Sequence, residues 1–184
     1  MLFKATIGFI ITATIVISTR QIIAPPQPRL LYNPSQSAAV GWYRVQPNLP
    51  IARGSQVAAY APEWARRLAD ERGYLPNDYP LIKTVWAVEG EEVCYHNQSV
   101  SVPKRPDIPL LGQDALGRVM PQMSGCIVLK SGEYLLISPD VQNGFDSRYF
   151  GPVGKANIIG RVKFIGNSKN KKSSEIVGFV GFGG

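Results

Sequence analysis

The sequence predicts a mostly β domain with one short helix, preceded by an N-terminal transmembrane helix. First, 15 prolines and 18 glycines divide the 184 residues into short segments, which favours strands and loops over a helical bundle. Second, apolar runs such as Ser55–Tyr60 and Leu81–Val88 have the length of strands. Third, Leu2–Ser18 is apolar except for Lys4 and a few threonines. These observations predict a mostly β domain carried on a membrane segment.

The N-terminal region, residues 1–23, is expected to be a retained membrane anchor. A full span needs ~20 apolar residues, and Arg20 can extend the helix by reaching the interface with its long side chain. The alternative is a cleavable signal peptide, but no clear Ala-x-Ala site precedes the domain. Ala24–Arg29 is a stiff, proline-rich spacer that would hold the domain near the membrane.

The folded domain is expected to span residues 30–166, followed by a basic tail over residues 167–184 that ends in glycines and should be poorly ordered. One convincing helix lies at Pro62–Gly73, with proline in its first turn and glycine as its C-cap. Trp64 and Leu68, with Ala65 and Ala69, should make its inward face. The main strands are expected at Val40–Val45, Ser55–Tyr60, Leu81–Val88, Cys126–Lys130, Tyr134–Ser138 and Ile158–Ile165.

Charge and composition restrict the partners. The net charge is +7, and basic residues gather from Tyr149 onwards, beginning with Lys155. No nucleic-acid-binding motif accompanies them, so an anionic membrane surface is the better partner. One histidine and two cysteines exclude a structural zinc site built from Cys and His alone, and neither a metal nor another cofactor is expected. In an exported protein Cys94 and Cys126 would form one disulfide, whereas in the cytoplasm they would be buried thiols.

Two serines and a lysine are the candidate catalytic residues. Ser35 and Ser37, at i and i+2, point to the same side of an extended chain, where one could attack a carbonyl and the other could stabilise the oxyanion. Ordinary turn chemistry is the alternative. Lys83 lies in an apolar strand, where burial would lower its pKa and allow it to act as a base, unless that strand is half-exposed. His96 lies in a polar run and is the weaker candidate base.

A third stretch contains Asp146 and Arg148, again at i and i+2, which could pair on one side of the chain. The alternative is a surface turn with an incidental ion pair worth little.

Together the three stretches resemble the type I signal peptidase family (S26), and most closely its conjugative-transfer, TraF-type branch. The first box is Asn33, Ser35, Ser37, Ala39, Gly41 and Tyr43, the lysine box runs from Leu81 to Gly90, and the closing box runs from Phe145 to Val153. The resemblance implies a signal-peptidase-like β-barrel or β-sandwich and a Ser-Lys dyad, a variant of the serine hydrolase triad. Ser37 would be the nucleophile, Lys83 the general base, and Ser35 with the Ser37 N–H the oxyanion hole. Asp146 and Arg148 would be scaffold.

The sequence departs from the family pattern at three positions. Ala39 replaces a proline, Thr84 stands where the wider family often has arginine, and Gly144 stands where leader peptidases have a serine that hydrogen-bonds the lysine. A partner for Lys83 must therefore come from elsewhere in the chain.

The resemblance implies a membrane-anchored serine endopeptidase whose catalytic domain faces the periplasm at the inner membrane. Its expected substrate is the pilin precursor of a conjugative type IV secretion system, held in a groove with shallow pockets for small residues. In some members processing ends with cyclisation of the pilin. The alternatives are a general leader peptidase acting on many exported preproteins and a catalytically silent, membrane-tethered assembly protein.

Overall fold

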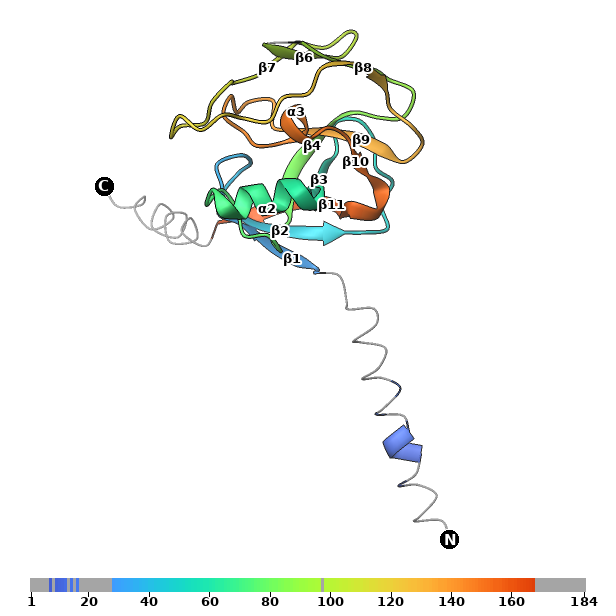
Figure 1. Cartoon of the computed structure of the whole chain (residues 1–184). Helices are drawn as coiled ribbons and strands as arrows, with labels where there is room; N and C mark the ends of the chain where they lie inside the picture. The colour runs from blue at the N-terminus through green and yellow to red at the C-terminus, as the bar shows by residue number, and fades with distance from the viewer. Residues whose placement is uncertain are drawn as a thin grey trace, which may run out of the picture.

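The computed structural model describes residues 7, 9–12, 14, 16, 28–96 and 98–167, and it confirms a mostly β architecture (Figure 1). A seven-stranded sheet has the order β1-β2-β11-β3-β4-β9-β10, and a four-stranded sheet has the order β7-β6-β5-β8. The larger sheet consists of β1 (Leu30–Asn33), β2 (Gly41–Gln46), β3 (Gln56–Ala59), β4 (Leu81–Ala87), β9 (Glu133–Ile137), β10 (Val153–Gly154) and β11 (Ile158–Gly166). The smaller sheet consists of β5 (Glu92–Tyr95), β6 (Ser99–Ser101), β7 (Ile108–Pro109) and β8 (Gly125–Val128). All the main strands expected from the sequence are present.

The predicted anchor and tail fall largely outside the described residues. Of residues 1–23, those described (7, 9–12, 14 and 16) are helical, and only the last two residues of the spacer and the first of the tail are described. Within the described parts of the chain, none of the helices combines the length and the apolar character that crossing a membrane requires.

Helix α2 (Glu63–Glu71) occupies the predicted position and packs through its small residues. Ala65 and Ala69 are buried, whereas Trp64, expected on the inward face, is 48% exposed. The helix ends before Gly73, whose φ of +69° is the left-handed conformation that glycine adopts easily. Small side chains let α2 lie close to the sheet, so the larger aromatic residue of this helix points outward.

The expectation of a single helix was wrong, because a second one, α3 (Ser147–Phe150), follows β9, and a 3₁₀ turn, η1 (Lys155–Asn157), precedes β11. The Asp146 carboxylate caps α3 by accepting a hydrogen bond from the Arg148 N–H. All four residues of α3 are buried. A helix this short is set by its cap and its tertiary packing, because one turn carries no helical periodicity in the sequence.

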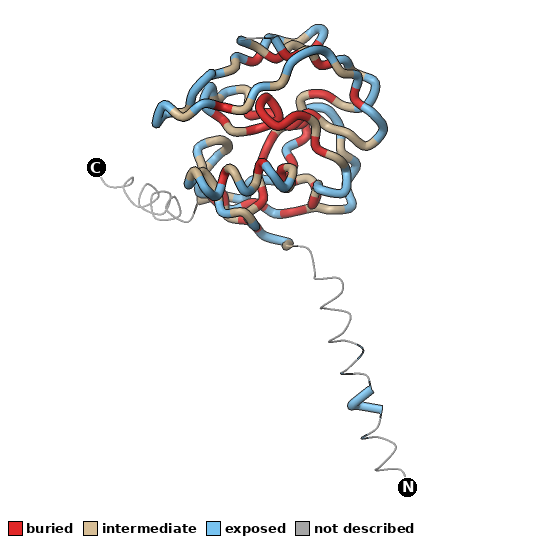
Figure 2. Tube along the Cα trace, viewed as in Figure 1, coloured by how far each residue is buried: buried red, intermediate tan, exposed pale blue. Residues whose placement is uncertain are grey.

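Three clusters of buried hydrophobic side chains make up the core, and Figure 2 shows the buried segments of the chain in red. One of them joins the two sheets, combining Ala87 of β4 and Leu135 of β9 with Val93 of β5 and Val100 of β6. Strand β4 lies between β3 and β9 and is buried on both sides along much of its length. A residue at the centre of β4 is therefore shielded from water by both neighbouring strands and the clusters against them.

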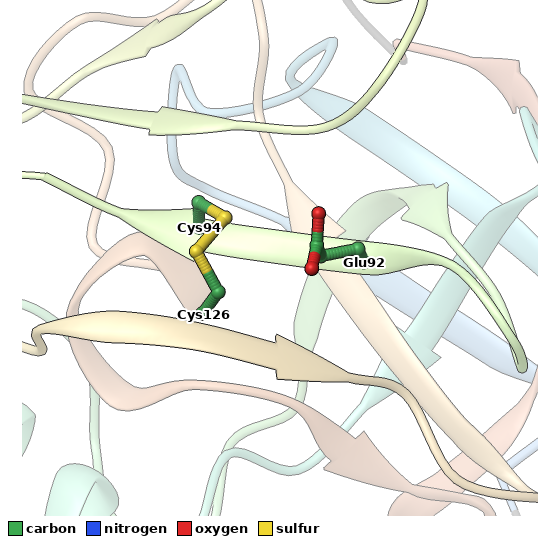
Figure 3. A group of neighbouring side chains, drawn as sticks. All are labelled: Glu92, Cys94 and Cys126. Carbon is green, nitrogen blue, oxygen red and sulfur yellow. A yellow bond between two sulfur atoms is a disulfide. The ribbon is translucent and has the colours of Figure 1, made fainter.

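The smaller sheet carries the disulfide expected of an exported protein. Cys94 of β5 and Cys126 of β8 are opposite one another in the antiparallel pair, and their sulfur atoms are bonded (Figure 3). The bridge closes a loop with a sequence separation of 32, which contains β6, β7 and the polar excursion between Ser99 and Gln122.

Candidate active site

The loop between β1 and β2 carries the two candidate serines, and Asn33 holds it in shape. The Asn33 side-chain N–H groups donate to the carbonyl oxygens of Ser35 (2.7 Å), Ala38 (3.1 Å) and Ala39 (3.2 Å). The Tyr43 hydroxyl also donates to the Ala39 carbonyl, at 2.9 Å. These contacts fix the loop even though Ala39 stands where the family pattern has proline.

Ser35 and Ser37 contact one another, as their i and i+2 spacing predicts. The Ser35 hydroxyl donates to Ser37 Oγ at 3.1 Å, and the Ser37 backbone N–H donates to Ser35 Oγ at 3.1 Å. The Ser35 hydroxyl and the Ser37 N–H are the two donors expected to form the oxyanion hole. In this state they bond within the loop, so a substrate carbonyl would have to take over both.

Lys83 lies at the centre of β4 and is only 3% exposed, so the half-exposed strand considered from the sequence is wrong. Burial lowers the pKa of its amine from 10.5 to about 8, against an opposing effect of Asp146, while Arg148 lowers the pKa further. A lysine with a pKa of about 8 loses its proton about two pH units earlier than an ordinary lysine, and a general base must be deprotonated to act.

The partner that Gly144 cannot supply is Ser138, at the end of β9. The Lys83 Nζ donates to the Ser138 hydroxyl at 2.9 Å, and Ser138 is itself buried. Ser138 is not among the site residues predicted from the sequence, although it is the last residue of the predicted strand Tyr134–Ser138. The antiparallel register pairs Thr84 with Ile137 and so brings Ser138 beside Lys83. Ser138 could therefore have been predicted as the partner only if the pairing of these strands had been known.

Gly144 lies against the buried ion pair. A Cβ at this position would be 3.2 Å from an Asp146 carboxylate oxygen and 3.4 Å from an Arg148 guanidinium nitrogen. A side chain here would have to displace one of them slightly. The position therefore fits glycine best, and the hydroxyl next to the lysine comes from Ser138, directly after β9.

Asp146 and Arg148 form a fully buried, two-point ion pair rather than a surface turn. Arg148 Nε and Nη2 donate to the two carboxylate oxygens at 2.8 and 2.9 Å. The same guanidinium donates to the carbonyls of Ser138 (3.0 Å), Val141 (3.0 Å) and Gln142 (2.9 Å). Asp146 also accepts from the Ser138 N–H at 2.9 Å. The pair thus holds both sides of the Ser138 backbone.

A single cavity of about 590 Å³ brings the candidate residues together. Ser35 and Ser37 line it from the β1–β2 loop, and Lys83 lines it from β4. Among the described residues, the hydrogen bond of the Lys83 amine goes to Ser138 and not to Ser37. Catalytic hydrogen bonds are often longer in free enzymes and shorten when substrate binds.

The other candidate base considered from the sequence, His96, lies elsewhere. His96 is exposed, with its Nε2 3.2 Å from Ser101 Oγ, and lines a separate cavity of about 170 Å³. Glu92 lies next to the disulfide on β5 (Figure 3). Sulfur atoms bonded to each other are not the thiolates that bind metals, so the oxidised group is a poor metal site.

The chain belongs to the signal peptidase family, peptidase S26, whose family model matches residues 2–166. Its relatives include a plasmid transfer protein TraF of Escherichia coli, 35% identical over 69% of this chain and 77% of that protein. A probable conjugal transfer protein TraF of Sinorhizobium fredii is 37% identical over 72% of this chain and 73% of that protein. The resemblance to the TraF-type branch is thereby confirmed.

A solved structure was also found. It is the crystal structure of a signal peptidase I from Enterococcus faecalis, whose sequence is 16% identical to this chain. The match covers 64% of this chain and 100% of the signal peptidase chain, with a TM-score of 0.37.

Proposed function

We propose that this protein is a membrane-anchored serine endopeptidase that uses a Ser37–Lys83 dyad to process an exported precursor. The observation that carries the proposal is Lys83: a buried amine with a pKa of about 8 that lines the same cavity as Ser37. Ser35 and the Ser37 N–H would stabilise the oxyanion, and Asp146 and Arg148 would act as scaffold. The catalytic domain would face the periplasm, in agreement with the disulfide.

In the first step, neutral Lys83 accepts the Ser37 proton as Ser37 Oγ attacks the carbonyl carbon of the scissile bond. Neutral Lys83 bonds Ser138 through one N–H, so its lone pair remains available to accept the Ser37 proton. The carbonyl oxygen becomes an oxyanion and takes over the donors that bond within the loop in the free protein. Lysine then returns the proton to the leaving amine, which departs and leaves an acyl-enzyme.

In the second step, the acyl-enzyme is resolved by a nucleophile that Lys83 deprotonates. Water gives a free carboxylate and completes hydrolysis. The amino terminus of the same substrate would instead give a new peptide bond and a cyclic product, as in some members of the branch. One site supports either outcome, because only the attacking group differs.

The substrate proposed is the pilin precursor of a conjugative secretion system, and support comes from the relatives named as plasmid and conjugal transfer proteins. The test co-expresses the pilin precursor with wild-type protein or with Ser37→Ala in the periplasm-facing orientation. Wild type should shorten the precursor and Ser37→Ala should not, while both remain in the membrane fraction. The mass of the product distinguishes hydrolysis, which adds water, from cyclisation.

The same assay separates the alternatives. Processing of unrelated secretory precursors at a similar rate would indicate a general leader peptidase. Normal pilus assembly with Ser37→Ala would indicate a silent assembly protein and would refute the dyad.

A further inference from the structure

We propose that the aromatic side of the catalytic cavity is a subsite for a bulky apolar side chain of the substrate, bordered by part of the segment 111–120, here called the 111–120 loop. The inference rests on the proposed function, because Ser37 and Lys83 line the same cavity. It differs from the shallow pockets for small residues expected from the family resemblance.

Three stacked and tilted rings form one wall. Tyr74 and Phe145 have ring centroids 5.5 Å apart, and Phe145 and Tyr149 are stacked at 6.1 Å. Phe145 directly precedes Asp146, which bonds Ser138 and through it reaches Lys83. The aromatic wall therefore begins next to the catalytic centre, within reach of a side chain close to the scissile bond.

The 111–120 loop adjoins the aromatic wall and is fixed in place by Asp114. The Asp114 carboxylate accepts hydrogen bonds from the Tyr74 hydroxyl, from Arg118 Nε at 2.7 Å and from the backbone N–H of Leu116 at 2.9 Å. Arg72, just after α2, adds a bond from Nη2 to the Val119 carbonyl at 3.0 Å. The loop is thus tied to Tyr74 and to the end of α2.

The Asp114 carboxylate already accepts the hydrogen bonds of this network, so it is not available to pair with a basic residue of the substrate. Burial raises the pKa of Asp114, but the bonds from Tyr74 and Arg118 outweigh it and hold the pKa below its usual range. Beside it, the lining on this side is apolar and comes from Leu75, Leu111 and Met120. An apolar side chain suits this wall better than a charged one, because burial removes apolar surface from water on both partners.

The volume of the cavity supports a large occupant. About 590 Å³ lies in the range of sites that enclose whole ligands, ~300–1,000 Å³. Alanine side chains alone would leave the aromatic wall in contact with water. A bulky residue, aromatic or long aliphatic, would cover it.

The experiment uses short, fluorescein-labelled alanine peptides in which a single phenylalanine is placed at each position in turn. Cleavage by the full-length protein in detergent is measured as kcat/KM, and binding to Ser37→Ala is measured by fluorescence anisotropy. Phenylalanine at one position should improve kcat/KM and binding ~10-fold or more over alanine. Ala115→Phe, which adds bulk from an exposed position that lines the cavity, should abolish this preference, so that kcat/KM becomes equal for the phenylalanine and all-alanine peptides.

Leu116→Phe is the matched control, because Leu116 is the next residue on the same turn, is 76% exposed and is not among the cavity-lining residues. It should behave as wild type. A preference for alanine at every position, or a phenylalanine preference that survives Ala115→Phe, would overturn the subsite. Position-specific phenylalanine binding without any Ser37-dependent cleavage would refute the proposed peptidase and leave the subsite standing.

Discussion

The Lys83 amine donates a hydrogen bond to the Ser138 hydroxyl, 2.9 Å away, and both residues are buried. The ion pair of Asp146 and Arg148 holds the Ser138 backbone from both sides, through its N–H and its carbonyl. The ion pair is therefore linked to the candidate base through Ser138. This chain places the lysine partner directly after β9, at Ser138, rather than further along the following loop, where Gly144 lies.

Activity is expected to rise with pH as Lys83 loses its proton. Because the pKa of Lys83 is lowered to about 8, kcat/KM should increase tenfold per pH unit below that value and level off above it. Lys83→Arg should be inactive at every pH, since the guanidinium keeps its proton throughout this range. The measurement is a pH–rate profile on one peptide, and an active Arg variant would rule out the general base.

Removing the Ser138 hydroxyl should misplace the base without unfolding the domain. We expect Ser138→Ala to lower kcat ~10-fold or more with little change in KM, because the orienting bond acts on the chemical step. The kinetic pKa should shift as well, which a purely structural role would not cause. Ser138→Thr, which keeps the hydroxyl, should recover part of the activity.

Ser55→Ala is the control for this experiment, because it also removes a buried hydroxyl, one that accepts from the Ala52 N–H at 3.2 Å. It should change stability and leave kcat and the pH profile unchanged. Equal effects of the two variants on kcat would contradict a positioning role for Ser138.

Ser35→Ala should leave measurable activity. Loss of one oxyanion donor typically costs ~10²–10³ in turnover, and the Ser37 N–H would remain as the second donor. Single-turnover kinetics with Ser35→Ala and Ser37→Ala side by side is the measurement. Activity of Ser35→Ala at the wild-type rate would exclude Ser35 from the oxyanion hole.

Lys83→Met should stabilise the fold at low pH. The lysine pKa is about 8 in the folded protein against 10.5 in the unfolded chain, so burying the ammonium costs roughly 3 kcal/mol below pH 8. That cost disappears as pH rises from 8 to 10.5. The Tm of the variant should therefore exceed that of wild type at pH 6, and the difference should shrink steadily towards pH 10.5. A difference independent of pH would contradict the lowered pKa.

Loss of the disulfide should reduce stability and spare the chemistry. Chain-entropy arguments give roughly 3–4 kcal/mol for a loop of this length, in which Cys94 and Cys126 are 32 positions apart. The double variant Cys94→Ser, Cys126→Ser should unfold at lower denaturant concentration and keep its kcat. Mass spectrometry of protein purified from membranes without reductant should show the bridge, and two free thiols would argue against a periplasmic domain.

The features that could be predicted from the sequence alone are those set by residues close together in the chain. The spacing of Ser35 and Ser37 puts their hydroxyls on the same side of the chain, and apolar runs between turn residues mark the strands. The lysine in one such run raised the possibility of a buried base. These are local properties, because periodicity and turn chemistry act over a few residues.

Contacts between distant parts of the chain were decided by the tertiary structure. Strand pairing beside β4 buried Lys83 and brought Ser138 to its amine, across 55 positions of sequence. Burial made Asp146 and Arg148 an interior ion pair that holds the Ser138 backbone, instead of a surface pair, and the network of Asp114 tied the 111–120 loop to Tyr74. Such contacts depend on which strands become neighbours and on how much water they exclude, and a one-dimensional pattern of residues determines neither.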